Sequence, residues 1–267
     1  MAMVVLEYAI GVIALCILLS FLAYWQKVLD KWGCVMAFGI GVVIGIFGNI
    51  LWLILLLFFL ITSFGATKYK YALKKEKGVG EGRIGERHFK NVLANGLAPA
   101  YIALVSFGEF QFIEEKWMAE VAFVAAISVA ASDTVASELG VISDKAYLIT
   151  NPRKRVKPGT SGGVSWLGQL WALIAAAYTA IVGWVVLFFI PHIFGNSIEV
   201  FSNNSHSSTS PFALITIPII IGFLGCQIDS LLGATLEQKG WISNNGVNLA
   251  ATSLGGLIAW MMIPLVT

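Results

Sequence analysis

Long runs of apolar residues, separated by shorter polar segments, follow one another along most of this chain. An apolar run of about 20 residues is long enough to cross a bilayer as a helix. The pattern predicts an all-α, polytopic membrane bundle of about eight transmembrane helices. Their expected bounds are 3–23, 33–48, 50–66, 91–107, 118–140, 163–190, 211–236 and 246–266.

The second and third helices come from a single apolar stretch, residues 33–66. This stretch is too long for one ordinary span, so a break is needed inside it. Gly48 and Asn49 provide a break, because glycine and asparagine favour turns over helix interiors.

The composition supports the membrane assignment: 58% of the residues are hydrophobic and only 12% are charged. Soluble domains contain about 25% charged residues. The simplest organisation is one membrane domain covering residues 1–267. No basic tail or nucleic-acid-binding motif occurs, so we do not expect nucleic acid as a partner; a homo-oligomer is left open.

The lysines and arginines indicate how the bundle lies in the membrane. With both termini outside, 16 of the 17 fall in the inner segments 24–32, 67–90, 141–162 and 237–245. Cytoplasmic loops are enriched in these residues. The sequence therefore predicts a multi-pass protein of the cell membrane, with the loops 67–90 and 141–162 in the cytoplasm.

Four acids fall in or at the inner ends of two predicted spans: Asp133, Glu138, Asp229 and Glu237. An acid at the centre of a membrane helix costs about 2.5–3.5 kcal/mol on insertion scales, and usually marks a function. Mg²⁺ prefers a few carboxylates together with water and phosphate oxygens. We therefore expect Asp133 and Asp229, from different helices, to hold Mg²⁺ near the inner surface, supported by Ser132, Thr134, Ser137, Glu138 and Glu237.

Groups suited to binding phosphate occur on the same predicted side of the membrane. Helix N-termini and cationic side chains favour bound phosphate, and arginine can bind it in a bidentate way. The basic loop could simply fix the topology, and the asparagines could simply cap helices. The expected nucleotide- and phosphate-binding residues are Asn91, Asn95, Arg153, Lys154, Arg155, Lys157, Thr160, Ser161, Gly162, Asn245 and Asn248, with the Thr-Ser-Gly turn placed at a helix start.

The loop 67–90 is basic and glycine-rich, but its glycines lack the order of a Walker loop or a dinucleotide fingerprint. Two interpretations remain open. The loop is either a solvated segment that fixes topology and touches anionic lipid, or a mobile flap whose cations close over a nucleotide.

Five strings of this sequence resemble the membrane family that includes phytyl-phosphate kinase, in the same order and over nearly the whole chain. They are NVLANG (91–96), ASDTVASELG (131–140), KRVKPGTSGGVS (154–165), DSLLGATLEQ (229–238) and NNGVNLAATSLGG (244–256). More distantly, the chain is similar to phytol kinase, dolichol kinase and CDP-diacylglycerol synthase.

The resemblance implies an enzyme that uses CTP and transfers its γ-phosphoryl group to a prenyl monophosphate, giving prenyl diphosphate and CDP. It implies that Asp133 and Asp229 are metal-binding or catalytic, with Glu138 acting as a base or as ligand support. The prenyl chain length, and CTP rather than another nucleotide, are left open. Two alternatives remain: a cytidylyltransferase that makes a CDP-lipid, and a transporter of an anionic or phosphorylated solute.

Overall fold

The structure, a computed structural model, describes residues 2–82, 84–109, 116–190 and 211–262. Its α-helices are α1 (Ala2–Trp25), α2 (Lys31–Val43), α3 (Ile50–Lys68), α4 (Tyr71–Glu76), α5 (Phe89–Glu109), α6 (Lys116–Gly140), α7 (Trp166–Trp184), α9 (Pro211–Leu232) and α10 (Asn244–Met262). Three π-helical segments, η1 (Ile44–Gly48), η2 (Val185–Phe189) and η4 (Gly233–Glu237), continue α2, α7 and α9.

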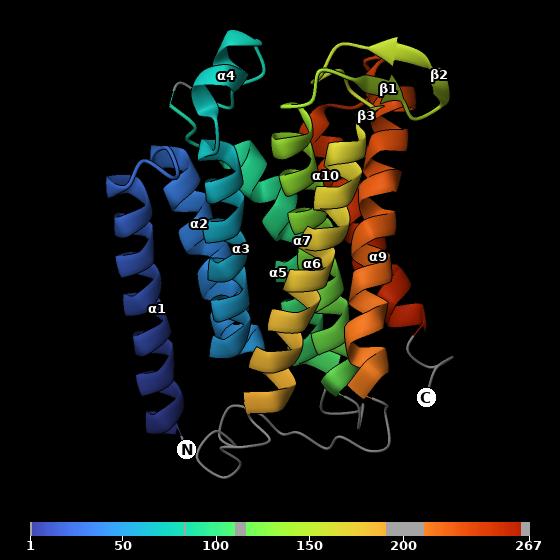
Figure 1. Cartoon of the computed structure of the whole chain (residues 1–267). Helices are drawn as coiled ribbons and strands as arrows, with labels where there is room; N and C mark the ends of the chain where they lie inside the picture. The colour runs from blue at the N-terminus through green and yellow to red at the C-terminus, as the bar shows by residue number, and fades with distance from the viewer. Residues whose placement is uncertain (1, 83, 110–115, 191–210, 263–267) are drawn as a thin grey trace.

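The long helices run up and down in one bundle (Figure 1). The start of α1 and the end of α10 lie at one end of it. The short helix α4 and a small β-sheet lie at the opposite end, called the sheet end below. This arrangement confirms the predicted helical membrane fold.

Within the described residues, six helices are long and apolar enough to cross a membrane. The predicted spans 91–107 and 246–266 also form helices, α5 and α10, although residues 263–266 of the second lie outside the described residues. These two helices are less apolar because each carries asparagines near its start, and they complete a bundle of about eight long helices.

Helix α6 is the central helix of the bundle: it packs against α3, α5, α7, α9 and α10. Of an 18-residue stretch within its candidate span, 89% is buried. Nearly half of the residues on α6 are Ala, Ser, Thr or Gly, and such small residues let neighbouring membrane helices approach closely. The central position of α6 carries Asp133 into the interior of the bundle.

The break between the second and third predicted spans lies where it was expected. Asn49 separates η1 from α3, and its side chain accepts a hydrogen bond from the Trp52 backbone N–H at 3.0 Å. The side chain therefore satisfies one of the unpaired N–H groups at the start of α3.

The expected loop 141–162 contains strands, which the sequence analysis missed. The strands β1 (Ala146–Leu148), β2 (Asn151–Val156) and β3 (Gly163–Val164) form an antiparallel sheet with the order β2-β1-β3. Tyr147 lies opposite both Arg155 and Val164. Strands of two to six residues are too short to produce a clear alternating pattern.

The predicted helix start at residue 163 is also wrong. Gly163 and Val164 belong to β3, and α7 begins at Trp166 after the cap residue Ser165. Ser165 Oγ accepts from the Gly168 N–H at 3.1 Å and donates to the Gly140 carbonyl at 3.0 Å. The cap therefore also ties α7 to the end of α6.

Candidate active site

Two acidic side chains from different helices meet near the sheet end. Asp133 on α6 and Asp229 on α9 have their carboxyl groups within hydrogen-bonding range of each other. Asp229 is 8% exposed. With its amide nitrogen turned toward Asp229, Asn248 of α10 donates to Asp229 Oδ2 at 3.2 Å and to the Asn244 carbonyl at 3.0 Å. The predicted convergence of the two aspartates is thus present in the structure.

A polar cavity of about 210 Å³ surrounds this pair, and it is called the polar cavity below. Most of the predicted site residues line it. From the predicted set, the lining includes Asn91, Asp133, Thr134, Ser137, Glu138, Thr160, Ser161, Gly162, Asp229, Glu237 and Asn248.

The predicted turn lies against the cavity, and three residues separate it from the start of α7. Gly162 has a φ of +73°, a left-handed conformation that glycine adopts without strain. A Cβ added to Gly162 would overlap Ala234 of η4, and one added to Gly233 would lie 3.0 Å from the Gly162 nitrogen. Gln238 Nε2 donates to the Ser161 carbonyl at 2.7 Å. These contacts fix the turn on the helix segment that follows Asp229.

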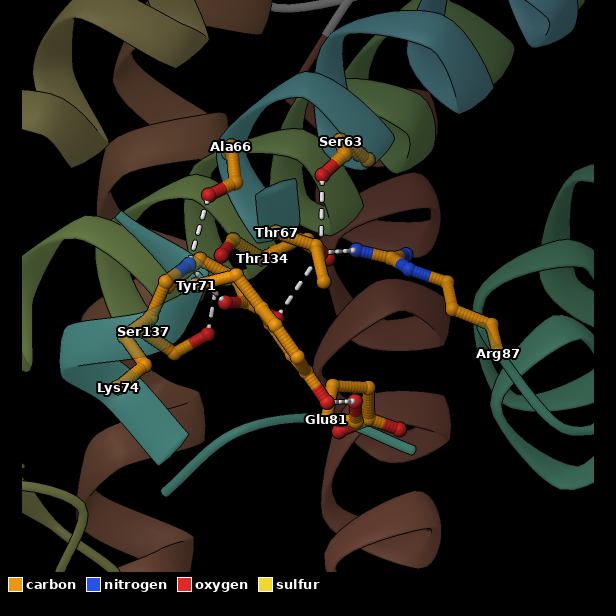
Figure 2. A network of polar contacts seen from close by, with 10 residues as sticks. Ser63, Ala66, Thr67, Tyr71, Lys74, Glu81, Arg87, Thr134 and Ser137 are labelled. Atoms are coloured by element: carbon orange, nitrogen blue, oxygen red, sulfur yellow. Dashed lines mark hydrogen bonds and ion pairs between the residues drawn. The ribbon is translucent and has the colours of Figure 1, made fainter. Parts of the chain in front are cut away.

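A second polar network joins the loop 67–90 to α6 (Figure 2). Lys74 is fully buried, and its Nζ lies 2.7 Å from Glu138 Oε2 and 2.8 Å from the Ala66 carbonyl. Thr67 Oγ1 donates to Glu138 Oε1 at 2.9 Å and accepts from Arg87 Nη2 at 3.3 Å. Both oxygens of Glu138 therefore already have partners, and Glu138 anchors the loop to the bundle.

Arg87, which was not among the predicted site residues, lines the polar cavity together with both aspartates. Its side chain is 4% exposed, and its Nε has no hydrogen-bond partner among the described residues. Burial lowers the pKa of Arg87, while the nearby Glu138, Glu81 and Asp133 act in the opposite direction. The sequence held one signal for Arg87, its position four residues before Asn91. In the structure Arg87 Nη1 lies 3.5 Å from Asn91 Oδ1.

The structure does not bring the predicted basic cluster to the cavity wall. Arg153, Lys154, Arg155 and Lys157 are exposed, and none of them lines the polar cavity. The first three lie on β2, an edge strand that β1 separates from β3. Arg155 Nη2 instead donates to the Asp144 carbonyl at 2.9 Å. The structure therefore places these four cations away from the cavity wall, and their binding to phosphate stays a prediction.

Three other predicted residues lie elsewhere. Ser132 points to α7, where its Oγ donates to the Ala172 carbonyl at 2.9 Å. Asn95 donates to the Asn91 carbonyl at 3.0 Å and lines a neighbouring apolar cavity. Asn245 does not line the polar cavity, whereas Asn244 does. The four-residue spacing of Asn244 and Asn248 already indicated that these two share a helix face.

The donor set at the aspartate pair fits Mg²⁺ in part. No group of three or more His, Cys, Asp or Glu side chains that could hold a metal occurs among the described residues. Mg²⁺ is commonly held by one or two carboxylates plus substrate phosphates and waters. Asp133 and Asp229 supply two carboxylates in a polar cavity, which suits a metal that arrives with a polyphosphate.

Several known proteins are similar to this chain over most of its length. The chain is 28% identical to an uncharacterized membrane protein of Methanocaldococcus jannaschii, over 93% of this chain and 91% of that protein. It is 32% identical to Protein PGR of Arabidopsis thaliana (85% and 78%). It is 28% identical to the chloroplastic Protein VTE6 of the same plant (81% and 59%).

No solved structure matches this chain. A family model described as integral membrane protein DUF92 matches residues 14–256, which is most of the sequence. The chain therefore belongs to the DUF92 family of integral membrane proteins.

Proposed function

We propose that this protein is a Mg²⁺-dependent phosphotransferase that moves the γ-phosphoryl group of CTP to a prenyl monophosphate. The products are a prenyl diphosphate and CDP. One observation carries the proposal: carboxylates from two helices, Asp133 and Asp229, meet in a polar cavity beside the buried cation Arg87. The resemblance of the motifs to the phytyl-phosphate kinase family supports the choice of substrates.

The reaction needs little acid–base chemistry. An oxygen of the acceptor phosphate forms a bond to the γ-phosphorus, and the bond from that phosphorus to the oxygen bridging it to the β-phosphate breaks. Both substrates are already anionic, so no proton has to be removed from the acceptor. Catalysis of this kind depends on positioning and charge stabilisation.

Each part of the cavity has a role in this proposal. Asp133 and Asp229 hold the metal, which neutralises charge on the polyphosphate when bound. Arg87 faces the acceptor phosphate, and the hydroxyls and backbone of the turn Thr160–Gly162 orient the nucleotide phosphates. Glu138 keeps Lys74 and the loop 67–90 in place, a role that needs no proton transfer.

The exposed cations of β2 then attract the nucleotide without touching it. Arg153, Lys154 and Arg155 lie at the sheet end, the same end as the polar cavity. A positive patch raises the association rate of an anionic ligand and loses this effect at high salt. We propose that the sheet end faces the cytoplasm of a cell membrane, in keeping with the positive-inside rule.

The decisive experiment combines purified protein, Mg²⁺, geranylgeranyl or phytyl phosphate, and CTP labelled on the γ-phosphate. Labelled prenyl diphosphate together with CDP is the expected result. Release of pyrophosphate with a CDP-lipid would instead establish a cytidylyltransferase. Flux of an intact anionic solute through proteoliposomes, with no turnover, would establish a transporter.

The same assay identifies the nucleotide and the lipid. CTP is expected to support faster transfer than ATP, GTP or UTP at equal concentration. Acceptors of graded prenyl length would measure the chain-length preference directly.

A further inference from the structure

A second cavity of about 100 Å³ lies between α1, α2, α3 and α5. It is called the apolar cavity below, because most of its lining side chains are aliphatic or aromatic. Examples from the three N-terminal helices are Leu19, Ile40, Leu53, Leu57, Phe59 and Leu60. An apolar space of this size suits a short stretch of hydrocarbon, because an apolar cavity of about 150 Å³ can bind a molecule as small as benzene.

Apart from Ser20 of α1, the polar residues that line the apolar cavity are at or just before the start of α5. Arg87, Asn91 and Asn95 line it there. Arg87 and Asn91 also line the polar cavity, so the two cavities share a wall. The unpartnered Nε of Arg87 is a buried donor at this junction. A buried donor without a partner costs free energy that a bound anion would recover.

The opposite end of the apolar cavity is closed by close helix contacts. A Cβ added to Gly41 would lie 3.1 Å from Cys16 Sγ and 3.7 Å from Leu53 Cδ2. One turn further along, a Cβ added to Gly45 would lie 2.6 Å from Val12 Cγ1. From Lys31 to Gly41 the rise along α2 is about 15 Å. The cavity therefore has a cationic mouth and an apolar floor.

We infer that the apolar cavity holds the first part of the hydrocarbon tail of the lipid phosphate acceptor, with its phosphate at Arg87 and Asn91. This inference rests on the proposed function and adds to it a place for the part of the tail next to the phosphate. The phosphate then faces the polar cavity, where the nucleotide binds. The contact of Cys16, Gly41 and Leu53 forms the floor of the cavity, and the rest of a long tail lies outside it.

The charge and shape both favour a single-chain lipid phosphate. The mouth offers one guanidinium and one amide, which suits one phosphate. The lining offers one apolar space, whereas a diacyl lipid would need room for two tails. Common phospholipids are therefore poor occupants.

Photolabelling of the wild-type protein tests the site without depending on catalysis. The probe is a geranylgeranyl monophosphate with a diazirine in the second isoprene unit from the phosphate. Labels are expected on α1 near Cys16 and on α3 near Leu53. Unlabelled geranylgeranyl phosphate should compete for the site, and inorganic phosphate and phosphatidic acid should not.

The inference would be overturned by labels on α7 or α9. It would also be overturned by labelling that geranylgeranyl phosphate does not displace, or that inorganic phosphate or phosphatidic acid displaces equally well. An inactive protein that still shows the expected labels would refute the kinase reaction and keep the lipid site. The two failures are therefore distinguishable.

A pair of variants on α2 tests the same cavity by kinetics. Ala37 lines the apolar cavity, whereas Gly39 is exposed and a Cβ added there meets nothing within 4 Å. Ala37→Phe should raise the KM for geranylgeranyl phosphate by about tenfold, because the ring takes up space that the tail needs. The KM for CTP should stay the same.

Gly39→Phe adds even more bulk to the same helix on a different face, and should leave both KM values unchanged. Equal behaviour of the two variants in an active enzyme would refute the tail site. If Ala37→Phe does not fold, the photolabelling of the wild-type protein still decides the question.

Discussion

Two parts of the bundle, called the halves below, are packed in different ways. The tighter half is centred on α6 with α7, α9 and α10, and the looser half consists of α1, α2, α3 and α5 around the apolar cavity. Of an 18-residue stretch within the candidate span of α6, 89% is buried, against 11% for the corresponding stretch of α1. Around α6, glycines let helices touch: a Cβ added to either Gly225 of α9 or Gly255 of α10 would overlap Val129. Around α1, large aliphatic side chains surround the apolar cavity. Tight packing holds the acids in a defined geometry, whereas looser packing leaves space for an apolar ligand.

In the proposed function, the tightly packed half holds the reacting groups and the looser half binds the lipid tail. Acids buried in a bundle need nearby partners, and small side chains bring three helices close enough to provide them. A hydrocarbon tail needs volume and few directional contacts. The loop 67–90 joins the halves, because Lys74 and Arg87 connect it to α6 and α5.

The largest expected effect comes from the aspartate pair. Asp133→Asn and Asp229→Asn should each lower kcat by about 10³-fold or more, because each removes a negative ligand from the metal and phosphate site. The kinase assay at saturating CTP and prenyl phosphate measures this. Near-normal activity of either variant would remove that residue from the site.

Asp144→Asn is the matched control. Asp144 is exposed, and its carboxylate lies 2.8 Å from Lys77 Nζ. A surface ion pair contributes little to stability, because water and salt screen it. The control should keep both its activity and its thermal stability.

The contact of the loop 67–90 with α6 depends on the buried pair Lys74–Glu138. Lys74→Met or Glu138→Gln alone should destabilise the protein by about 3 kcal/mol, because each change leaves a buried group without its partner. The double variant should be less destabilised than the sum of the two. Thermal unfolding in detergent measures all four proteins of this cycle.

The same variants decide the role of Glu138. If Glu138 only anchors the loop, Glu138→Gln should keep its kcat within about tenfold of the wild type at temperatures where it is folded. A loss as large as that of Asp133→Asn would instead make Glu138 a catalytic base, as one of the interpretations of the sequence holds.

The close contact below the turn can be tested with two glycines of similar conformation. Gly162 and Gly240 have φ values of +73° and +72°, but an added Cβ meets Ala234 at Gly162 and nothing within 4 Å at Gly240. Gly240→Ala should cost about 1 kcal/mol from backbone strain alone. Gly162→Ala should cost about 1–3 kcal/mol more, because it also overpacks the contact. Equal melting temperatures would show that the contact is not tight.

The smallest expected effect lies in the looser half, where His88 Nδ1 is 2.7 Å from Asp30 Oδ2. The hydrogen bond to Asp30 raises the pKa of His88 above its ordinary 6.5. The stabilisation is therefore full below 6.5 and is lost as the pH rises through the raised pKa.

Because the His88 side chain is 55% exposed, solvent screens the pair and the effect should be about 0.5 kcal/mol. His88→Gln should melt slightly lower than the wild type at about pH 5.5 and at the same temperature near pH 9. A difference that grows with pH would contradict this sign.

Much of the fold was predictable because its signals are local. Apolar runs mark the helices, and Gly48-Asn49 marks the break between two of them. The aspartates stood out because acids are rare in apolar spans. The sheet was missed because its strands are very short, and the helix start at residue 163 was misplaced for the same reason.

The cations of the site could not be chosen from the sequence. Eight lysines and arginines occur in residues 67–90 and five in 141–162, and in both segments they look alike. The basic run on β2 looked the stronger candidate, yet an edge strand keeps it exposed. Lys74 and Arg87 are buried because Glu138, Thr67 and Asn91 receive their hydrogen bonds.

The order of residues by itself determined the number and course of the long helices. It also determined which acids lie in apolar spans, where their burial costs free energy and indicates a functional site. Hydrophobic transfer and charge burial act on each segment separately, so both can be read along the chain. Only the tertiary structure decided which cations face those acids and that the polar and apolar cavities share Arg87. Such pairings depend on contacts between segments far apart in sequence, and these exist only after the helices have packed.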